Sequence, residues 1–189
     1  MAETETQTTP KLDEVAGTWA IDSAHSLAQF KAKYMMIVNV KGRFDELEGT
    51  VELKEPLEES TIDVTFKTAS ISTNDDKRDG HLRSPDFFDV EAHPVMTFRG
   101  TGIERTSDTA GKVFGDLTIR GLARPVELDI EFNDWTPKDL WGKQRLSFSG
   151  SARINRGDWD LKWNQALETG GVLVGDRIEI ELEVSLVRE

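Results

Sequence analysis

The chain has 189 residues, which suits one domain, and hydrophobic residues make up 37% of it. Its formal charge of -12 disfavours nucleic acid as a partner, because a phosphate backbone is bound by clustered Lys and Arg. The sequence contains no cysteine, which excludes disulfides, thiolate catalysis and Cys-ligated metal centres.

Residues 1–14 are polar and acidic, and we expect them to form a flexible tail before a single domain over residues 15–189. No basic start with an apolar core marks a secretory signal, so the sequence predicts a cytoplasmic protein if Met1 is the natural start. The longest apolar run, Met35–Val38, is far shorter than the ~20 residues that span a bilayer. We therefore expect no stable membrane insertion.

Alternation of apolar and polar residues predicts antiparallel strands along most of the chain. In chain order, the strands are expected at residues 18–21, 28–33, 40–44, 50–53, 61–68, 95–105, 112–119, 122–135, 145–155 and 177–187. The last of these is typical, since Ile178, Ile180 and Leu182 share one face and glutamates occupy the other. Arg120–Gly121 predicts a tight hairpin turn.

The stretch Asn74–Ser84 breaks this alternation and predicts a short helix. Thr73 or Asn74 can cap it, and acidic residues suit its positive N-terminal end. Phe87 and Phe88 follow and are expected to hold the helix against the body of the protein. A second, less regular insert is expected at residues 156–176.

Antiparallel strands in this number, with a short helical insert, indicate an all-β protein, either a sandwich or a closed barrel. A barrel is favoured because the sequence shows few devices that protect edge strands. At about eight strands, the interior of a barrel is just wide enough to be filled by side chains or to hold one small ligand.

Five segments, in family order, resemble the bacterial YceI-like proteins. They are TWAIDSAHSLAQF, NVKGRFDELEGTV, DDKRDGHLRSPDFFDVEAHPVMTF, GDLTIRGLARPVEL, and INRGDW through ETGGVLVGDRIEIELEV. The resemblance runs from about Gly17 to the C-terminus. It implies a lipocalin-like antiparallel barrel of about eight strands whose apolar tunnel holds a long isoprenoid or other lipid chain, often in a homodimer. Tyr34 stands where members typically have His, and the secretory signal of many members is not seen.

A ligand site inside the barrel would gain affinity from apolar burial alone. One methylene contributes ~0.8 kcal/mol, so a five-carbon isoprenoid unit contributes about 3–4 kcal/mol before ordering costs. Alternation predicts the inward-facing lining residues Phe30, Phe66, Phe98, Leu117, Leu128, Ile130, Phe132 and Phe148. Further ligand contacts are expected from Tyr34, Met36, His81, Trp159 and Trp163, and the two tryptophans either plug a barrel end or line a tunnel mouth.

A pyrophosphate head group would need cations. The candidates are Arg78 and Arg83 in the helical insert, or Arg120 and Arg124 at the tight turn. The head group of an isoprenoid quinone would need only a hydrogen-bond donor, such as His81 or a tryptophan Nε1.

Catalytic and metal sites are not expected. Asp22, His25 and Ser26 have the composition of a hydrolase triad, but adjacent strand residues point to opposite faces. His25, His81 and His93 lack the spacing of a known metal motif. The predicted function is therefore to sequester or carry a long-chain isoprenoid or fatty lipid, without a cofactor or an enzymatic step. The alternative is a filled barrel that serves as a stress-response or protein-interaction module without a ligand.

Overall fold

The computed structural model describes residues 10–168 and 170–188, and most of the expected N-terminal tail lies outside this range. The end of the expected tail is structured, because Leu12–Val15 form helix α1 and Val15 is buried. The indole Nε1 of Trp19 donates a hydrogen bond to the Val15 carbonyl at 2.8 Å. The ordered body therefore begins before residue 15, where the sequence placed the boundary, because the apolar residues of α1 cover one end of the sheet.

In the described part of the chain, eleven strands form one antiparallel sheet. They are β1 (Gly17–Ile21), β2 (Leu27–Tyr34), β3 (Val38–Phe44), β4 (Leu47–Leu53), β5 (Thr61–Lys67), β6 (Ile71–Ser72), β7 (Val95–Arg105), β8 (Ala110–Ile119), β9 (Leu122–Thr136), β10 (Gln144–Asn155) and β11 (Val174–Arg188). Short 3-10 turns join some of them: η1 (Ser23–His25), η2 (Leu57–Glu59), η3 (Thr68–Ser70) and η4 (Arg156–Trp159).

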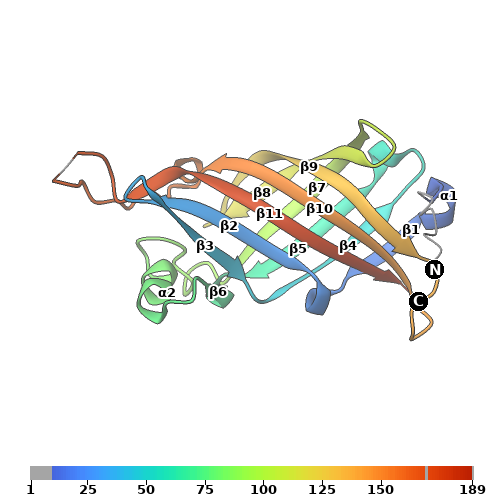
Figure 1. The fold of residues 1–189 in the computed structure, drawn as a ribbon, viewed down its shortest axis with the longest axis horizontal. Coiled ribbons are helices and arrows are strands. Elements are labelled where there is room, and N and C mark those ends of the chain that lie inside the picture. Colours follow the sequence, from blue (N-terminus) through green and yellow to red (C-terminus); the bar gives the residue numbers. More distant parts are fainter. Residues whose placement is uncertain (1–9, 169, 189) are drawn as a thin grey trace, which may run out of the picture.

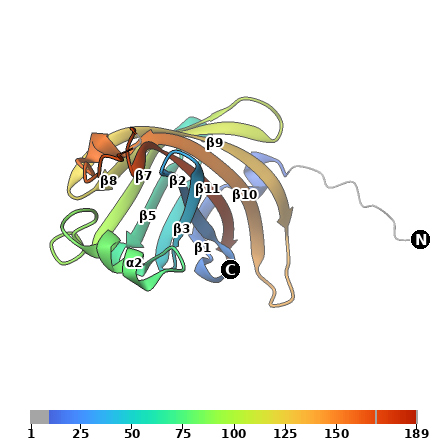
Figure 2. The same ribbon diagram turned by 60° about the vertical axis from the view of Figure 1, so that its left-hand side comes forward.

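Eight of these strands close into a barrel. The order is β1-β4-β5-β7-β8-β9-β10-β11, and β1 pairs with both β4 and β11 (Figures 1 and 2). One edge of β11 is shared, because its C-terminal part pairs with β1 and its N-terminal part with β2. Beyond β2, the sheet continues through β3 to β6. The predicted all-β, lipocalin-like barrel of about eight strands is confirmed.

The helical insert is helix α2 (Asp76–Arg83). Its N-cap is Asp75, whose carboxylate accepts a hydrogen bond from Arg78 N, and not Thr73 or Asn74. Asn74 has a left-handed φ of 60° instead of the extended backbone of an N-cap, and the Thr73 N–H donates to Asp79. Neither residue therefore caps the helix. The phenylalanines that follow α2 pack against the barrel as expected.

The tight turn predicted at Arg120–Gly121 joins β8 to β9. Both residues have positive φ, 51° and 73°, which is the backbone of a two-residue turn that fits the twist of antiparallel strands. At the other end of the barrel, near α1, lie η2, the β7–β8 loop and the β9–β10 loop (Figure 1). We refer below to the α1 end and the α2 end of the barrel.

Candidate functional site

The barrel encloses a cavity of about 680 Å³. Its wall is mostly apolar, because each strand directs every second side chain inward. Polar residues line it at the α1 end, at the α2 end and at the seam, which is the place where the pairing partner of β11 changes from β1 to β2. Those at the seam are Ser26, Gln29 and Glu183.

All eight lining residues predicted from alternation contribute to the wall of this cavity: Phe30, Phe66, Phe98, Leu117, Leu128, Ile130, Phe132 and Phe148. The rings of Phe132 and Phe148 lie edge to face, with centroids 5.6 Å apart. Trp159 also lines the cavity at the α2 end, and its Nε1 donates to the Leu117 carbonyl at 2.8 Å. Its indole N–H is thus used by the protein. Whether these side chains contact a ligand remains a prediction.

Further aromatic lining residues were not singled out from the sequence. Phe44 contacts Phe30, Phe66 and Phe88 with ring centroids 5.6 to 6.0 Å apart, and Phe87 also lines the cavity. The signal for Phe44 was its place two residues after Gly42 on the same face of β3. Phe87 and Phe88 lie in a loop, where alternation gives no information.

Four other candidate ligand contacts lie outside the cavity wall. Tyr34 and Met36 belong to the tip of the β2–β3 hairpin, which extends past the barrel end. His81 and Trp163 form a cluster with Phe87, with ring centroids 4.6 to 5.4 Å apart. This cluster joins α2 to the residues that follow η4, and Phe87 is its member in the cavity wall.

The head-group arginines of the helical insert donate to backbone carbonyls. Arg83 Nε donates to Ala69 O and Arg83 Nη2 to Ile71 O, both at 2.9 Å. Arg78 Nη2 donates to Thr73 O at 2.9 Å. These hydrogen bonds hold the segment that precedes α2 against the helix.

The other two candidate arginines, Arg120 and Arg124, also have structural roles at the tight turn. Arg124 Nε donates to Asp158 O at 3.0 Å, and Arg120 is one of the two turn residues. None of these four arginines lines the cavity, and as head-group ligands they remain predictions.

Arg156 is the polar residue that lines the α2 end, and it is only 4% exposed. Its guanidinium donates to the carbonyls of Leu161, Trp163, Val174 and Gly175 and lies 3.0 Å from an oxygen of Asp176. Burial lowers the pKa of this guanidinium, and Asp176 opposes the shift. All five of its N–H donors are engaged. Arg156 therefore holds the insert, which we define as residues 160–168 and 170–173, and offers no donor to a ligand.

At the α1 end, the cavity wall includes exposed residues, so the cavity reaches the surface there. This mouth carries Glu55, Glu58, Arg105, Asp108 and Thr109 around apolar residues of α1 and η2. Arg105, the one cation that lines this mouth within residues 10–168 and 170–188, donates to the backbone carbonyls of the β7–β8 loop and lies 3.7 Å from Asp108. The mouth is therefore acidic.

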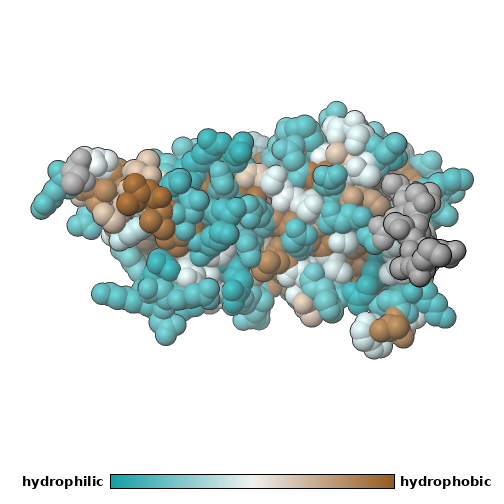
Figure 3. All heavy atoms as spheres, in the orientation of Figure 1, coloured by the Kyte–Doolittle hydropathy of each residue, from teal (hydrophilic) through white to brown (hydrophobic). Residues whose placement is uncertain are grey.

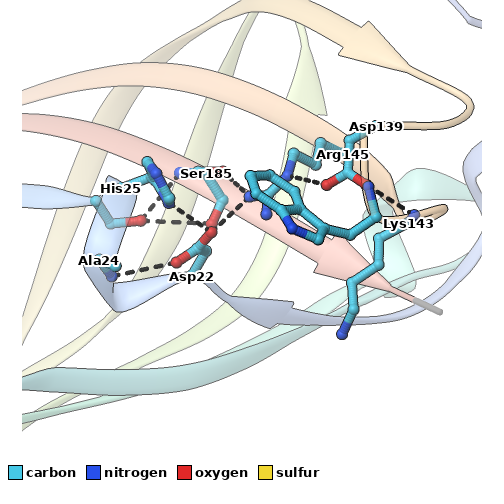
Figure 4. A network of polar contacts seen from close by, with 9 residues as sticks. Asp22, Ala24, His25, Asp139, Lys143, Arg145 and Ser185 are labelled. Carbon is cyan, nitrogen blue, oxygen red and sulfur yellow. Dashed lines mark hydrogen bonds and ion pairs between the residues drawn. The ribbon is translucent and has the colours of Figure 1, made fainter.

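Of the three residues that resemble a hydrolase triad, Asp22 and His25 belong to a network of ion pairs outside the cavity wall (Figure 4), whereas Ser26 lines the cavity at the seam. Asp22 lies 2.8 Å from His25 Nδ1 and 2.5 Å from Arg145, which also pairs with Asp139 at 2.7 Å. Ser26 Oγ accepts from the Ser185 N–H instead of facing a histidine.

Within residues 10–168 and 170–188, no group of His, Asp or Glu side chains is arranged to hold a metal ion. No helix in that range is long and apolar enough to cross a bilayer.

Comparisons with known proteins agree with this fold. The family model of the YceI-like domain matches residues 19–186. A UPF0312 protein of Staphylococcus aureus (strain bovine RF122 / ET3-1) is 38% identical over 165 residues, which cover 86% of this chain and 93% of that protein. The crystal structure of the Campylobacter jejuni YceI protein aligns with a TM-score of 0.70 at 31% identity, covering 83% of this chain and 90% of that one.

A polyisoprenoid binding domain from Saccharophagus degradans has the same fold. It aligns with a TM-score of 0.68 and covers 89% of this chain and 97% of that one. At 14% identity, this likeness concerns the fold alone.

Proposed function

Because the chain belongs to the family of YceI-like domains, we propose that it binds a long apolar lipid chain in the barrel cavity and so sequesters or carries it. The cavity is the observation that carries this proposal. Without an occupant, the apolar side chains of this wall lack packing partners on one side, and a buried lipid chain supplies those contacts. Water is a poor filler, because the wall offers few polar partners.

The alternative of a filled barrel without ligand requires a solid interior, and the cavity argues against it. An isoprenoid chain suits the wall, which combines phenylalanine rings with branched aliphatic side chains. The polyisoprenoid binding domain that shares this fold supports the same ligand class.

The acidic mouth favours an uncharged head group, such as that of a quinone, over a pyrophosphate. Glu55, Glu58 and Asp108 would repel an anion, and Arg105 is already engaged by its own loop. Near the α2 end, the guanidinium of Arg156 is saturated. A cytoplasmic location and a homodimer remain predictions from the sequence.

Native mass spectrometry followed by organic extraction tests the proposal. The purified protein should carry a discrete isoprenoid mass, and the stripped protein should take up an isoprenoid quinone more tightly than a polyprenyl pyrophosphate. Phe148→Asp should abolish uptake, because it places a carboxylate in the apolar wall. Ser151→Asp is the matched control on the exposed face of the same strand. The proposal fails if folded, stripped wild-type protein takes up neither lipid.

A further inference from the structure

An apolar tip protrudes from the α2 end of the molecule. It consists of the β2–β3 turn, Tyr34–Val38, and Val172 of the insert. Met36, Ile37 and Val38 are 54%, 76% and 52% exposed. The two segments are joined, because the Met35 N–H donates to the Leu173 carbonyl at 2.7 Å. Figure 1 shows both protruding at one end, and hydrophobic side chains gather there in Figure 3.

The fold does not require apolar residues in this turn. Met35 and Met36 both have positive φ, 50° and 64°, in the three-residue loop between Tyr34 and Val38, and such a left-handed backbone favours Asn and Gly. Their side chains are exposed, so they do not contribute to the core. Neither the backbone nor the core of the folded chain explains two methionines and an isoleucine in this turn. A contact with another molecule would explain them.

The hairpin behind the tip is basic, although the chain is acidic overall. Residues 23–44 contain three lysines, one arginine and no Asp or Glu. The four cations share the outer face of the hairpin, because they alternate with the inward-facing Phe30, Ala32, Gly42 and Phe44. Lys31 and Lys41 lie directly opposite each other. A like-charge pair in these positions destabilises a sheet, and Glu181 offsets the charge of Lys31 but not that of Lys41.

Two of these cations are available to a partner. Lys31 pairs with Glu181, and Arg43 with Asp45. Lys33 and Lys41 are exposed, and no hydrogen bond or ion pair joins their side chains to another residue in the described part of the chain. Lys33 lies three residues before Met36 and Lys41 four residues after Ile37, which at about 3.3 Å per residue places them about 10–13 Å along the strands from these two residues.

From this geometry we infer that the apolar tip docks on an anionic lipid bilayer. Met36 and Ile37 enter the apolar boundary, while Lys33 and Lys41 lie at the level of the head groups. A stable protein partner would need about 800 Å² and some 20–30 residues on this side, far more than one turn offers. The inference builds on the proposed function by naming the surface that the lipid carrier visits, and vesicle binding by lipid-free protein tests it separately.

The test is flotation of the full chain, stripped of lipid, with vesicles of phosphatidylcholine alone or with 30% phosphatidylglycerol added. Wild type should bind the anionic vesicles, at least about tenfold more weakly at high salt. The variant Met35→Asn/Met36→Gly/Ile37→Ser suits the turn and should fold, yet lose binding by about tenfold or more. Lys33→Glu/Lys41→Glu should lose it too.

The matched control is Leu140→Ser/Trp141→Ser in the β9–β10 loop, an apolar pair that is 94% and 73% exposed at the other end of the barrel. This variant should bind vesicles as wild type does. The inference is overturned if wild type does not float, if the tip variant floats equally well, or if the control alone loses binding. It is also overturned if the tip variant changes only the oligomeric state in light scattering, since the tip would then contact a second copy.

Discussion

At the scale of single residues, Arg145 connects separate segments of the chain at the α1 end. It joins Asp22, which follows β1, to Asp139 in the β9–β10 loop, and Asp139 also accepts the N–H groups of Trp141 and Lys143 at 2.8 and 2.9 Å (Figure 4). Burial acts to raise the pKa of Asp22, but hydrogen bonds from Arg145 and His25 outweigh it, so the pKa is lowered. For Asp139, the hydrogen bond from Arg145 lowers the pKa.

Arg145→Met should lower the free energy of unfolding by about 1–3 kcal/mol at pH 7, because Asp22 loses its partner. A carboxylate whose pKa is depressed on folding stabilises the protein above its unfolded pKa, and that contribution is lost as the pH falls through the folded value. The difference between wild type and variant should therefore shrink below about pH 4. Urea denaturation at pH 7 and pH 3 measures it. An equal difference at both pH values would show that the ion pairs do not contribute.

At the scale of elements, the strands and their faces were predictable, and the connections between distant residues were not. Residues 95–105 form β7 with the predicted bounds, and the lining faces follow from alternation because the side-chain period of a strand is fixed. Tyr34 and Met36 were predicted as ligand contacts because soft methionine side chains suit a lipid surface. The structure places both outside the cavity wall, and a strand pattern does not reveal where a hairpin leaves the barrel. The role of Arg156 was not visible either, since its partners lie 5 to 20 residues away.

The insert should depend on Arg156 as one unit. Arg156→Lys replaces five fixed donors by three on a single atom, which cannot reach all the carbonyls that the guanidinium binds. The loss should be about 3 kcal/mol locally, and tryptic cleavage at Lys162 should become at least about tenfold faster. The control, Arg153→Lys, changes an exposed residue of β10. Unchanged cleavage would mean that the aromatic cluster of His81, Phe87 and Trp163 holds the insert without Arg156.

At the scale of the whole molecule, a change that stabilises the lipid-free protein by filling the cavity should lower its affinity for lipid. Ala28 is a small residue of the cavity wall, and Ala28→Phe would fill space that a ligand otherwise occupies. The lipid-free variant should be more stable by about 0.5–2 kcal/mol, with a higher melting temperature. Its lipid affinity should fall by about a hundredfold, because the ring replaces roughly one isoprene unit. Thermal scans with and without lipid measure both effects, and Ala20→Phe on the exposed face of β1 is the control. A variant that loads normally would place the lipid elsewhere.

Closure of the barrel also sets what its ligand can be. Eight strands hydrogen-bonded in a ring fix the circumference, so the bore cannot widen for a thicker guest without breaking backbone pairs. The ligand can therefore vary in the length of its chain but not in its thickness. A lipid chain longer than the cavity would leave its surplus carbons in water at the acidic mouth, where they add nothing to affinity. The closed backbone therefore limits how many carbons of a lipid chain can contribute to binding.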